Sequence, residues 1–255
     1  MLVSDRGARA KALPPFARLE DAMAHRFLVL GAKPDPALPS PGSYDAVACA
    51  NASGRSAAAL GLPTPGFTVL TALLTDGSEA GRMRLAALRG LATGTVHYYP
   101  QRLKGRTVPE RALFRLRTWR TMAFMLRRAL RGVGFRYDRF SQRSTEDYRR
   151  LILELCRDDP EVAAQLDRKQ ASSGTLAVVL ALAEHDVERV IVSGFSFELT
   201  QAAGIDPNIA RRGTPASKHT PTDAVVLRTL ARHHPSLVTT EPVVHEVAGV
   251  PLLAA

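Results

Sequence analysis

The sequence predicts an α/β fold in which helices flank a mostly parallel sheet. Short apolar runs, each ended by glycine, proline or a small polar residue, recur along the chain and alternate with helical patterns. The runs are continuously apolar, which is typical of strands whose two faces are both covered. With 255 residues and a hydrophobic fraction of 45%, the chain is long enough for one large domain with a substantial core.

The expected elements follow from these runs in chain order. Strands are predicted over residues 26–31, 46–50, 67–74, 95–99, 189–194 and 237–240. Helices are predicted over residues 56–60, 79–90, 110–131, 146–156, 174–185 and 222–233. Ser144 and Asp147 have the spacing of a capping box. Thr220 followed by Pro221 is typical of an N-cap before proline at the first helical position.

The remaining segments define the predicted domain organisation. Residues 1–25 are expected to form a flexible arm, and residues 26–255 a single α/β domain. Residues 100–170 break the strand–helix alternation with basic helices and no predicted strand, which favours a helical insertion. Residues 199–218 are rich in loop-forming residues, and a loop of this length is often a lid.

The charge distribution is uneven. The net charge is +10, yet residues 101–150 alone carry fifteen Lys or Arg and four Asp or Glu, a net of +11. Such a segment can meet nucleic acid, an anionic membrane surface or an anionic substrate, or it can be a solvated face. Cys49 and Cys156 are too few and too distant to indicate a disulfide framework or a cysteine metal site. Without an apolar run of spanning length or a signal-peptide pattern, the protein is expected to be cytoplasmic.

Candidate binding residues fall where strands end, because ligands of open parallel sheets bind at the carboxyl edge. Gly31 and Ala32 follow the first strand, where an ordinary tight turn is the alternative interpretation. Asn51 follows the second, where asparagine can bond a ribose or phosphate or simply form a turn. The small residues 172–174 precede an apolar helix, so a phosphate could approach backbone N–H groups at the positive end of the helix dipole. A plain N-cap serine is the alternative there.

His219 stands out among the histidines. It precedes the expected Thr220 cap at the mouth of the 222–233 helix. A helix N-terminus disfavours imidazolium, and a neutral histidine can act as a general base near pH 7. A surface histidine beside a helix cap is the alternative. No His, Asp or Glu spacing predicts a metal site.

In order and spacing, several segments resemble the bacterial sialyltransferases of glycosyltransferase family 42. Residues 172–174 (SSG), the apolar helix and residues 193–197 (SGFSF) are similar to the family's T/S-S-G turn, helix and S-G-hydrophobic-D-F strand end. Residues 218–223 (KHTPTD) are similar to the H-S-x-x-T-D context of its catalytic histidine. Residues 31–35 (GAKPD) and 49–51 (CAN) are looser matches to its G-N-G-P-S and C-N elements.

The resemblance implies a Rossmann-like fold and inverting transfer of a sialic acid-like sugar from a CMP-activated donor to a glycan or glycolipid, without a metal or other cofactor. His219 would be the general base. No tyrosine follows Tyr148 to contact the leaving phosphate as in the family, so Arg211, Arg212 and Lys218 are the candidates for that role. Residues 199–218 would be the lid. The implied donor-binding residues are Gly31, Ala32, Asn51, Ser172, Ser173, Gly174 and Ser196.

Other interpretations stay open. The donor could carry a related acid such as Kdo, or the chain could be a relative that has lost the activity. A phosphotransferase or pyrophosphokinase-like enzyme using ATP and Mg²⁺ could share the fold, since fold alone does not fix function. The arginine-rich segment could instead bind nucleic acid. In the transferase interpretation, residues 110–150 could hold the enzyme at the inner membrane, and the family's habit of forming oligomers makes a homo-oligomer an expectation.

Overall fold

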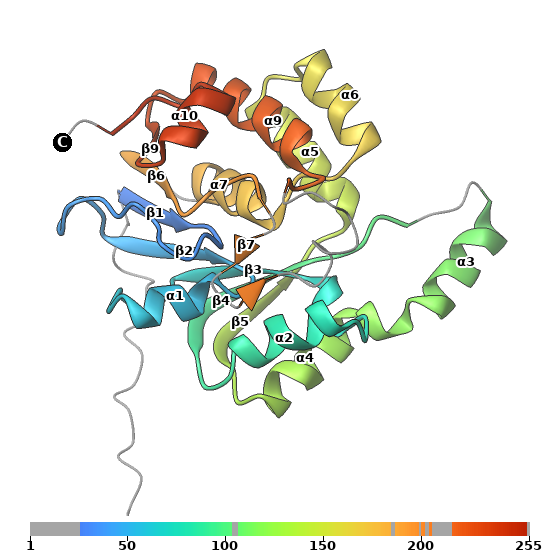
Figure 1. Ribbon diagram of the computed structural model, residues 1–255. Helices are drawn as coiled ribbons and strands as arrows, with labels where there is room; N and C mark the ends of the chain where they lie inside the picture. The colour runs from blue at the N-terminus through green and yellow to red at the C-terminus, as the bar shows by residue number, and fades with distance from the viewer. Residues whose placement is uncertain are drawn as a thin grey trace, which may run out of the picture.

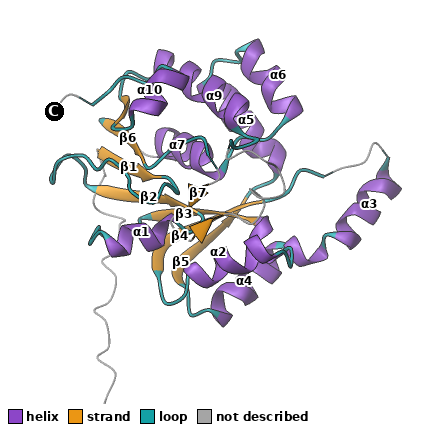
Figure 2. Ribbon diagram, in the orientation of Figure 1, coloured by secondary structure: helices purple, strands orange, loops and turns teal. Residues whose placement is uncertain are grey.

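A seven-stranded, all-parallel sheet with the order β5-β4-β3-β2-β1-β6-β9 forms the centre of the protein (Figure 1). The computed structural model describes residues 26–103, 107–184, 187–198, 200–201, 204–205 and 216–253. Helices cover both faces of the sheet, so the predicted α/β fold class is confirmed (Figure 2). The strands of this sheet are β1 (Arg26–Leu30), β2 (Ala46–Ala50), β3 (Phe67–Thr71), β4 (Ala92–Tyr99), β5 (Arg136–Gln142), β6 (Arg189–Ser193) and β9 (Leu237–Thr239).

The strand order places β1 at the point where the chain changes direction across the sheet. From β1 the chain adds β2 to β5 on one side, and β6 and β9 follow on the other side. Such a topological switch point leaves a crevice at the carboxyl ends of the strands that flank it, where ligands bind in open α/β sheets. The switch point here lies between β1 and β6, whose register aligns Leu30 with Ser193.

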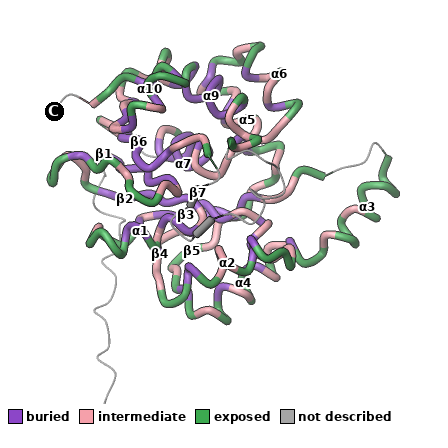
Figure 3. Tube along the Cα trace, in the orientation of Figure 1, coloured by how far each residue is buried: buried purple, intermediate pink, exposed green. Residues whose placement is uncertain are grey.

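Two helical layers enclose the sheet (Figure 3). Residues of β1 alternate between the two layers. Phe27 and Val29 of β1 pack in the core under α7, whereas Leu28 and Leu30 pack in the core on the opposite face with α1. The helices are α1 (Ser53–Ala59), α2 (Glu79–Ala87), α3 (Val108–Arg117), α4 (Ala123–Gly132), α5 (Thr145–Leu155), α6 (Pro160–Arg168), α7 (Ser173–Glu184), α9 (Thr220–His233) and α10 (Pro242–Ala248), with short 3₁₀ turns η2 (Ala72–Thr75) and η3 (Trp119–Thr121).

Helix α7 is the best-buried helix of the first layer. Its residues from Leu176 to Ala181 have no exposed surface, so the prediction of an apolar helix buried against the sheet is confirmed. The predicted capping box before α5 is also confirmed, because the Ser144 hydroxyl accepts from the Asp147 N–H and the Asp147 carboxylate accepts from the Ser144 N–H. Helices α6 and α10 have no counterpart among the predicted helices.

The prediction that residues 100–170 contain no strand is wrong. Strand β5 runs along the edge of the sheet and pairs parallel with β4. Its sequence, RYDRFSQ, mixes charged residues with Tyr137 and Phe140, which pack against the core between the sheet and α4. Charged side chains are usual on edge strands, where they discourage pairing with another chain. The continuous apolar pattern of the central strands is therefore missing here.

The single helix predicted over residues 110–131 is also wrong, because the chain breaks into α3, η3 and α4. At the break, the Thr118 hydroxyl donates to the Phe114 carbonyl at 2.7 Å, and the Thr121 hydroxyl donates to the Thr118 carbonyl at 2.7 Å. Such local side-chain bonds compete with the regular helical pattern. Strand β3 likewise ends at Thr71, three residues before its predicted end, where η2 begins.

Candidate functional site

A cleft of about 790 Å³ opens at the carboxyl ends of β1, β2, β3, β4 and β6. This is the edge of the sheet at which the switch point predicts a ligand. Arg211 and Arg212 lie outside the described residues, as does most of the predicted lid at 199–218 and the predicted arm at 1–25. The cleft brings together every predicted site residue that the structure describes: Gly31, Ala32, Asn51, Ser172, Ser173, Gly174, Ser196, Lys218 and His219.

The loop after β1 forms one wall of the cleft, and Gly31 is required there by close packing. A Cβ atom on Gly31 would lie 2.2 Å from the Gly194 carbonyl oxygen and 2.7 Å from the Phe195 ring. The Gly31 N–H donates to Ser193 and the Lys33 N–H to Gly194, so the loops after β1 and β6 are bonded together. Gly31 therefore fits the loop for a steric reason, and its contact with a donor stays a prediction.

Replacing Gly31 by alanine is expected to lower the free energy of unfolding by about 1–3 kcal/mol, because backbone atoms must move to admit the methyl group. Gly132→Ala is the matched control. Gly132 is exposed at the end of α4, and a Cβ there meets no atom within 4 Å. The control should be neutral or gain up to about 1 kcal/mol. Urea unfolding of both variants measures the difference, and equal stability of the two would contradict the steric account.

The N-terminus of α7 forms the floor of the cleft. The Ser172 hydroxyl accepts from the Thr175 N–H at 3.2 Å, so this side chain caps the helix as the alternative interpretation proposed. The Ser173 hydroxyl accepts from the Asn51 side-chain amide at 2.5 Å. Asn51 adopts a left-handed φ of 51° and its Oδ1 accepts from the Thr71 N–H, which ties β2, β3 and α7 together. The first N–H groups of a helix have no partner within the helix, so those of Ser173 and Gly174 can serve a ligand.

His219 lies at the N-terminus of α9 and lines the cleft. Its Nδ1 is 2.8 Å from the Gln170 carbonyl oxygen. Because a carbonyl can only accept, Nδ1 carries the proton, and in the neutral ring the lone pair is on Nε2. The prediction of Thr220 as N-cap is wrong: His219 occupies the cap position, and the Thr220 hydroxyl instead donates to the Phe197 carbonyl at 2.9 Å.

Asp223 is a cleft residue that was not among the predicted site residues, although the resemblance includes it in the 218–223 segment. It is 5% exposed in the first turn of α9, and its Oδ1 accepts from the Ser172 N–H at 2.8 Å. This bond joins the N-termini of α9 and α7. Burial raises the pKa of Asp223 to about 6, although the hydrogen bond from Ser172 opposes the shift.

The raised pKa of Asp223 predicts a pH-dependent contribution to stability. The folded protein takes up the proton more readily than the unfolded chain, so this contribution is present below pH 4 and is lost as pH rises through about 6. Asp223→Asn keeps the Oδ1 acceptor and removes the charge. We expect the variant to gain stability over the wild type between pH 4 and pH 7, by at most about 3 kcal/mol.

Urea unfolding across this pH range tests the prediction. Asp147→Asn is a control for which the stability should change with pH in the opposite direction, because hydrogen bonds from Ser144 lower the pKa of the exposed Asp147. The stability gap between Asp223→Asn and the wild type should widen as pH rises. Parallel pH profiles for the two proteins would contradict the assignment of a buried, titrating carboxyl at this position.

Further cations line the cleft without belonging to any motif. Arg102 follows β4, and its guanidinium donates to the carbonyls of Leu166 and Asp167 at the end of α6. These Arg and Lys residues come from separate segments and meet only in the folded structure, so no sequence spacing could have predicted them. Together with Lys218, these Arg and Lys residues outnumber the acidic residues of the cleft, which are Asp76, Glu198 and Asp223. The cations not predicted are Arg84, Arg102, Arg168 and Lys169.

Within the described residues, no group of three or more His, Cys, Asp or Glu side chains gathers where it could hold a metal ion. The expectation of a metal-independent reaction stays a prediction. Every helix in the described part of the chain is too short or too polar to cross a membrane.

Comparison with known proteins finds a distant structural similarity. No protein-family model matches the chain, and no curated protein matches it. Among solved structures, the chain is similar to the sialyltransferase CstII from Campylobacter jejuni, solved in complex with the substrate analogue CMP-3FNeuAc. The two share 11% sequence identity at a TM-score of 0.45, over 90% of this chain and 85% of that chain. At this level of similarity, membership in family 42 stays a prediction, and the function has to be argued from the site's own residues.

Proposed function

We propose that the protein is an inverting glycosyltransferase that moves a sialic acid-like sugar from a CMP-activated donor to a hydroxyl group, with His219 as the general base. The observation that carries the proposal is the 2.8 Å bond between His219 Nδ1 and the Gln170 carbonyl. This bond fixes the tautomer in which Nε2 can accept a proton, in a cleft that is also lined by the N-terminus of α7.

The proposed reaction is a single displacement. The acceptor oxygen attacks the anomeric carbon as the bond from that carbon to the donor phosphate breaks, and the bonding electrons leave with CMP. His219 Nε2 takes the proton of the acceptor hydroxyl, which keeps the attacking oxygen nucleophilic. Attack from the side opposite the leaving group inverts the anomeric centre.

The anionic parts of the donor fit the floor of the cleft. The Ser173 and Gly174 N–H groups and the positive end of the α7 dipole suit a phosphate or a sugar carboxylate. Because the Ser172 hydroxyl is used as a cap, Ser172 is proposed to act through its position rather than through that hydroxyl. Lys218, which lines the cleft, would stabilise the leaving phosphate together with Arg211 and Arg212. Asn51, Gly31, Ala32 and Ser196 would complete the donor site.

The release of CMP tests the proposal without knowledge of the acceptor, since water can replace the acceptor slowly. The purified protein is incubated with CMP-sialic acid or CMP-Kdo, with EDTA or with Mg²⁺, and free CMP is measured. We expect CMP release in EDTA from at least one donor. Absence of CMP release from both donors, together with Mg²⁺-dependent turnover of ATP, would favour the phosphotransferase alternative.

The acceptor and the cellular compartment are part of the same proposal. The acceptor would be a glycan or glycolipid, and the enzyme would act in the cytoplasm. A homo-oligomer and the closing of residues 199–218 over the donor stay predictions. Phe197, which precedes that segment, and Ser217, near its end, lie close together at the cleft, because the Ser217 N–H donates to the Phe197 carbonyl at 2.8 Å.

A further inference from the structure

Helix α3 stands away from the sheet and from both helical layers (Figures 1 and 3). Every residue of α3 other than Phe114 is exposed, and all ten are within the described part of the chain. Phe114 and the following Thr118 are partly buried and line the cleft. One side of the helix therefore contributes to the site, and its other sides are presented to the surroundings.

The outward side of α3 is apolar. Val108, Ala112 and Leu116 recur at a spacing of four, so they lie along one face of the helix. Val108 is 79% exposed, Leu116 69% and the adjacent Leu113 47%. The apolar surface continues into Trp119, which is 45% exposed in η3. Single exposed apolar residues are ordinary, but a contiguous stripe of this kind marks an interaction site.

Arginines flank the stripe. Arg115 and Arg117 of α3 and Arg120 of η3 are exposed, and Arg120 lies 5.9 Å from the centre of the Trp119 ring. Further exposed arginines follow in α4, at Arg127, Arg128 and Arg131. The partner of this surface must therefore accept apolar side chains and carry negative charge.

We propose that α3 and Trp119 dock on the surface of a bilayer that contains anionic lipid. An amphipathic basic helix with a tryptophan at its edge buries its apolar side among acyl chains while its arginines meet the headgroups. A second copy of the chain would place arginines against arginines. The area of one exposed helical face is also small compared with the roughly 800 Å² that each partner buries in a stable protein–protein interface. Nucleic acid would pair with the arginines but would leave the apolar stripe uncovered.

If the proposed transferase function holds, this docking has a consequence for the acceptor. Phe114 lines the cleft on the same short helix whose outer face meets the lipid, and Thr118, which follows that helix, lines the cleft as well. The mouth of the site would then lie at the membrane surface, within reach of a hydroxyl on a lipid-linked glycan. The docking itself does not depend on that function.

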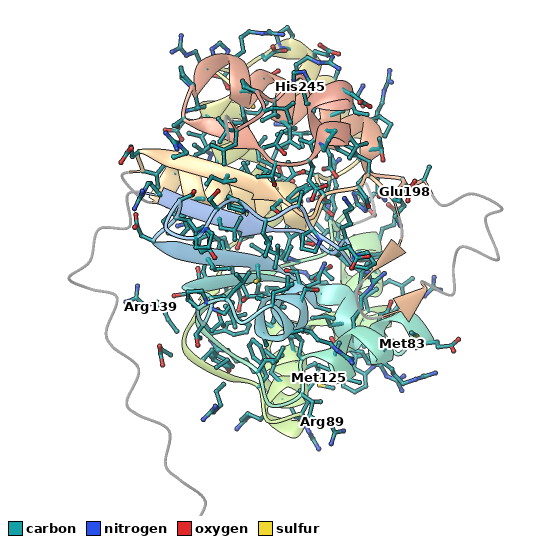
Figure 4. All side chains as sticks on the ribbon, turned by 60° about the vertical axis from the view of Figure 1, so that its left-hand side comes forward. Met83, Arg89, Met125, Arg139, Glu198 and His245 are labelled. Atoms are coloured by element: carbon teal, nitrogen blue, oxygen red, sulfur yellow. The ribbon has the colours of Figure 1, made fainter. Side chains whose placement is uncertain are left out.

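Vesicle co-sedimentation of the full chain, without donor, tests the docking. We expect binding to vesicles of phosphatidylcholine with phosphatidylglycerol, and little binding to phosphatidylcholine alone. The variants V108E/L116E and R115E/R117E should each lower the affinity at least about tenfold. The matched controls are Leu60→Glu, a 44% exposed leucine beside α1, and Arg89→Glu, an exposed arginine after α2 that Figure 4 labels.

The outcomes distinguish a bilayer from a second copy of the chain or nucleic acid as the partner of α3. Loss of binding in both α3 variants, with melting temperatures and controls unchanged, supports the proposal. Equal binding of all variants, or equal binding to both kinds of vesicle, overturns it. It is also overturned if α3 variants lower a concentration-dependent molecular mass in light scattering or abolish binding to random DNA, while vesicle binding stays unchanged. Failure of CMP release would instead concern the proposed transferase function alone.

Discussion

Replacing His219 by alanine is expected to lower donor turnover by about 10²–10⁴-fold, which is the usual contribution of a positioned general base. Binding of CMP should change little, because the proposed role of the ring concerns the acceptor hydroxyl. The measurement is CMP release under saturating donor, together with the dissociation constant for CMP.

Two further variants separate catalysis from positioning. His219→Asn retains a side-chain N–H near the position of Nδ1 that can still donate to the Gln170 carbonyl, but it has no basic atom. It should be as inactive as the alanine variant. His245→Ala is the matched control, because His245 makes the same kind of bond, from Nδ1 to the Val250 carbonyl at 2.9 Å. His245 lies on α10 and does not line the cleft (Figure 4). An active asparagine variant would make His219 a positioning residue only.

Replacing Glu241 by alanine is expected to lower the free energy of unfolding by about 2–5 kcal/mol, because it leaves two backbone N–H groups without their acceptor and the partly exposed Lys33 without its charge partner. Its side chain has no exposed surface and meets Lys33 Nζ at 2.6 Å. Its Oε1 also accepts from the N–H groups of Ala37 and Gly194, each at 2.8 Å. Since these bonds join the loops after β1 and β6, donor affinity should fall as well. Urea unfolding and CMP titration measure the two effects.

Matched variants show which of these bonds matters. Glu241→Gln keeps an oxygen for the two N–H groups and loses the charge that pairs with Lys33, so an intermediate loss is expected. Asp45→Ala breaks the exposed Arg26–Asp45 pair of 2.7 Å and should change the stability little, as is usual for surface ion pairs. A loss of similar size in Asp45→Ala and Glu241→Ala would contradict the special role of the buried carboxylate.

The central sheet and the position of the site could be predicted because both depend on local patterns. Runs such as FLVL and VIV are apolar throughout, and a parallel sheet must place the residues that follow them on one edge. Asn51, Ser173 and His219 are far apart in the chain, yet they meet in the cleft for this reason. The capping box at Ser144 was predictable for the same reason, since it depends on residues three apart.

The features that were missed depend on contacts across the fold. Glu241 and Lys33 are 208 positions apart, and although Lys33 lies in the GAKPD segment, Glu241 belongs to no motif. The burial of Asp223 depends on where α7 begins relative to α9, which no spacing within α9 reveals. Strand β5 and the break at Thr118 were missed because charged and hydroxyl side chains obscure the apolar period there.

Isothermal titration with CMP and with ATP tests the central claim most directly, because it concerns the ligand of the cleft before any chemistry. We predict that CMP binds in the presence of EDTA, that His219→Ala binds it with similar affinity, and that ATP with Mg²⁺ does not compete. Absence of CMP binding, with Mg²⁺-dependent binding of ATP in its place, would contradict the account.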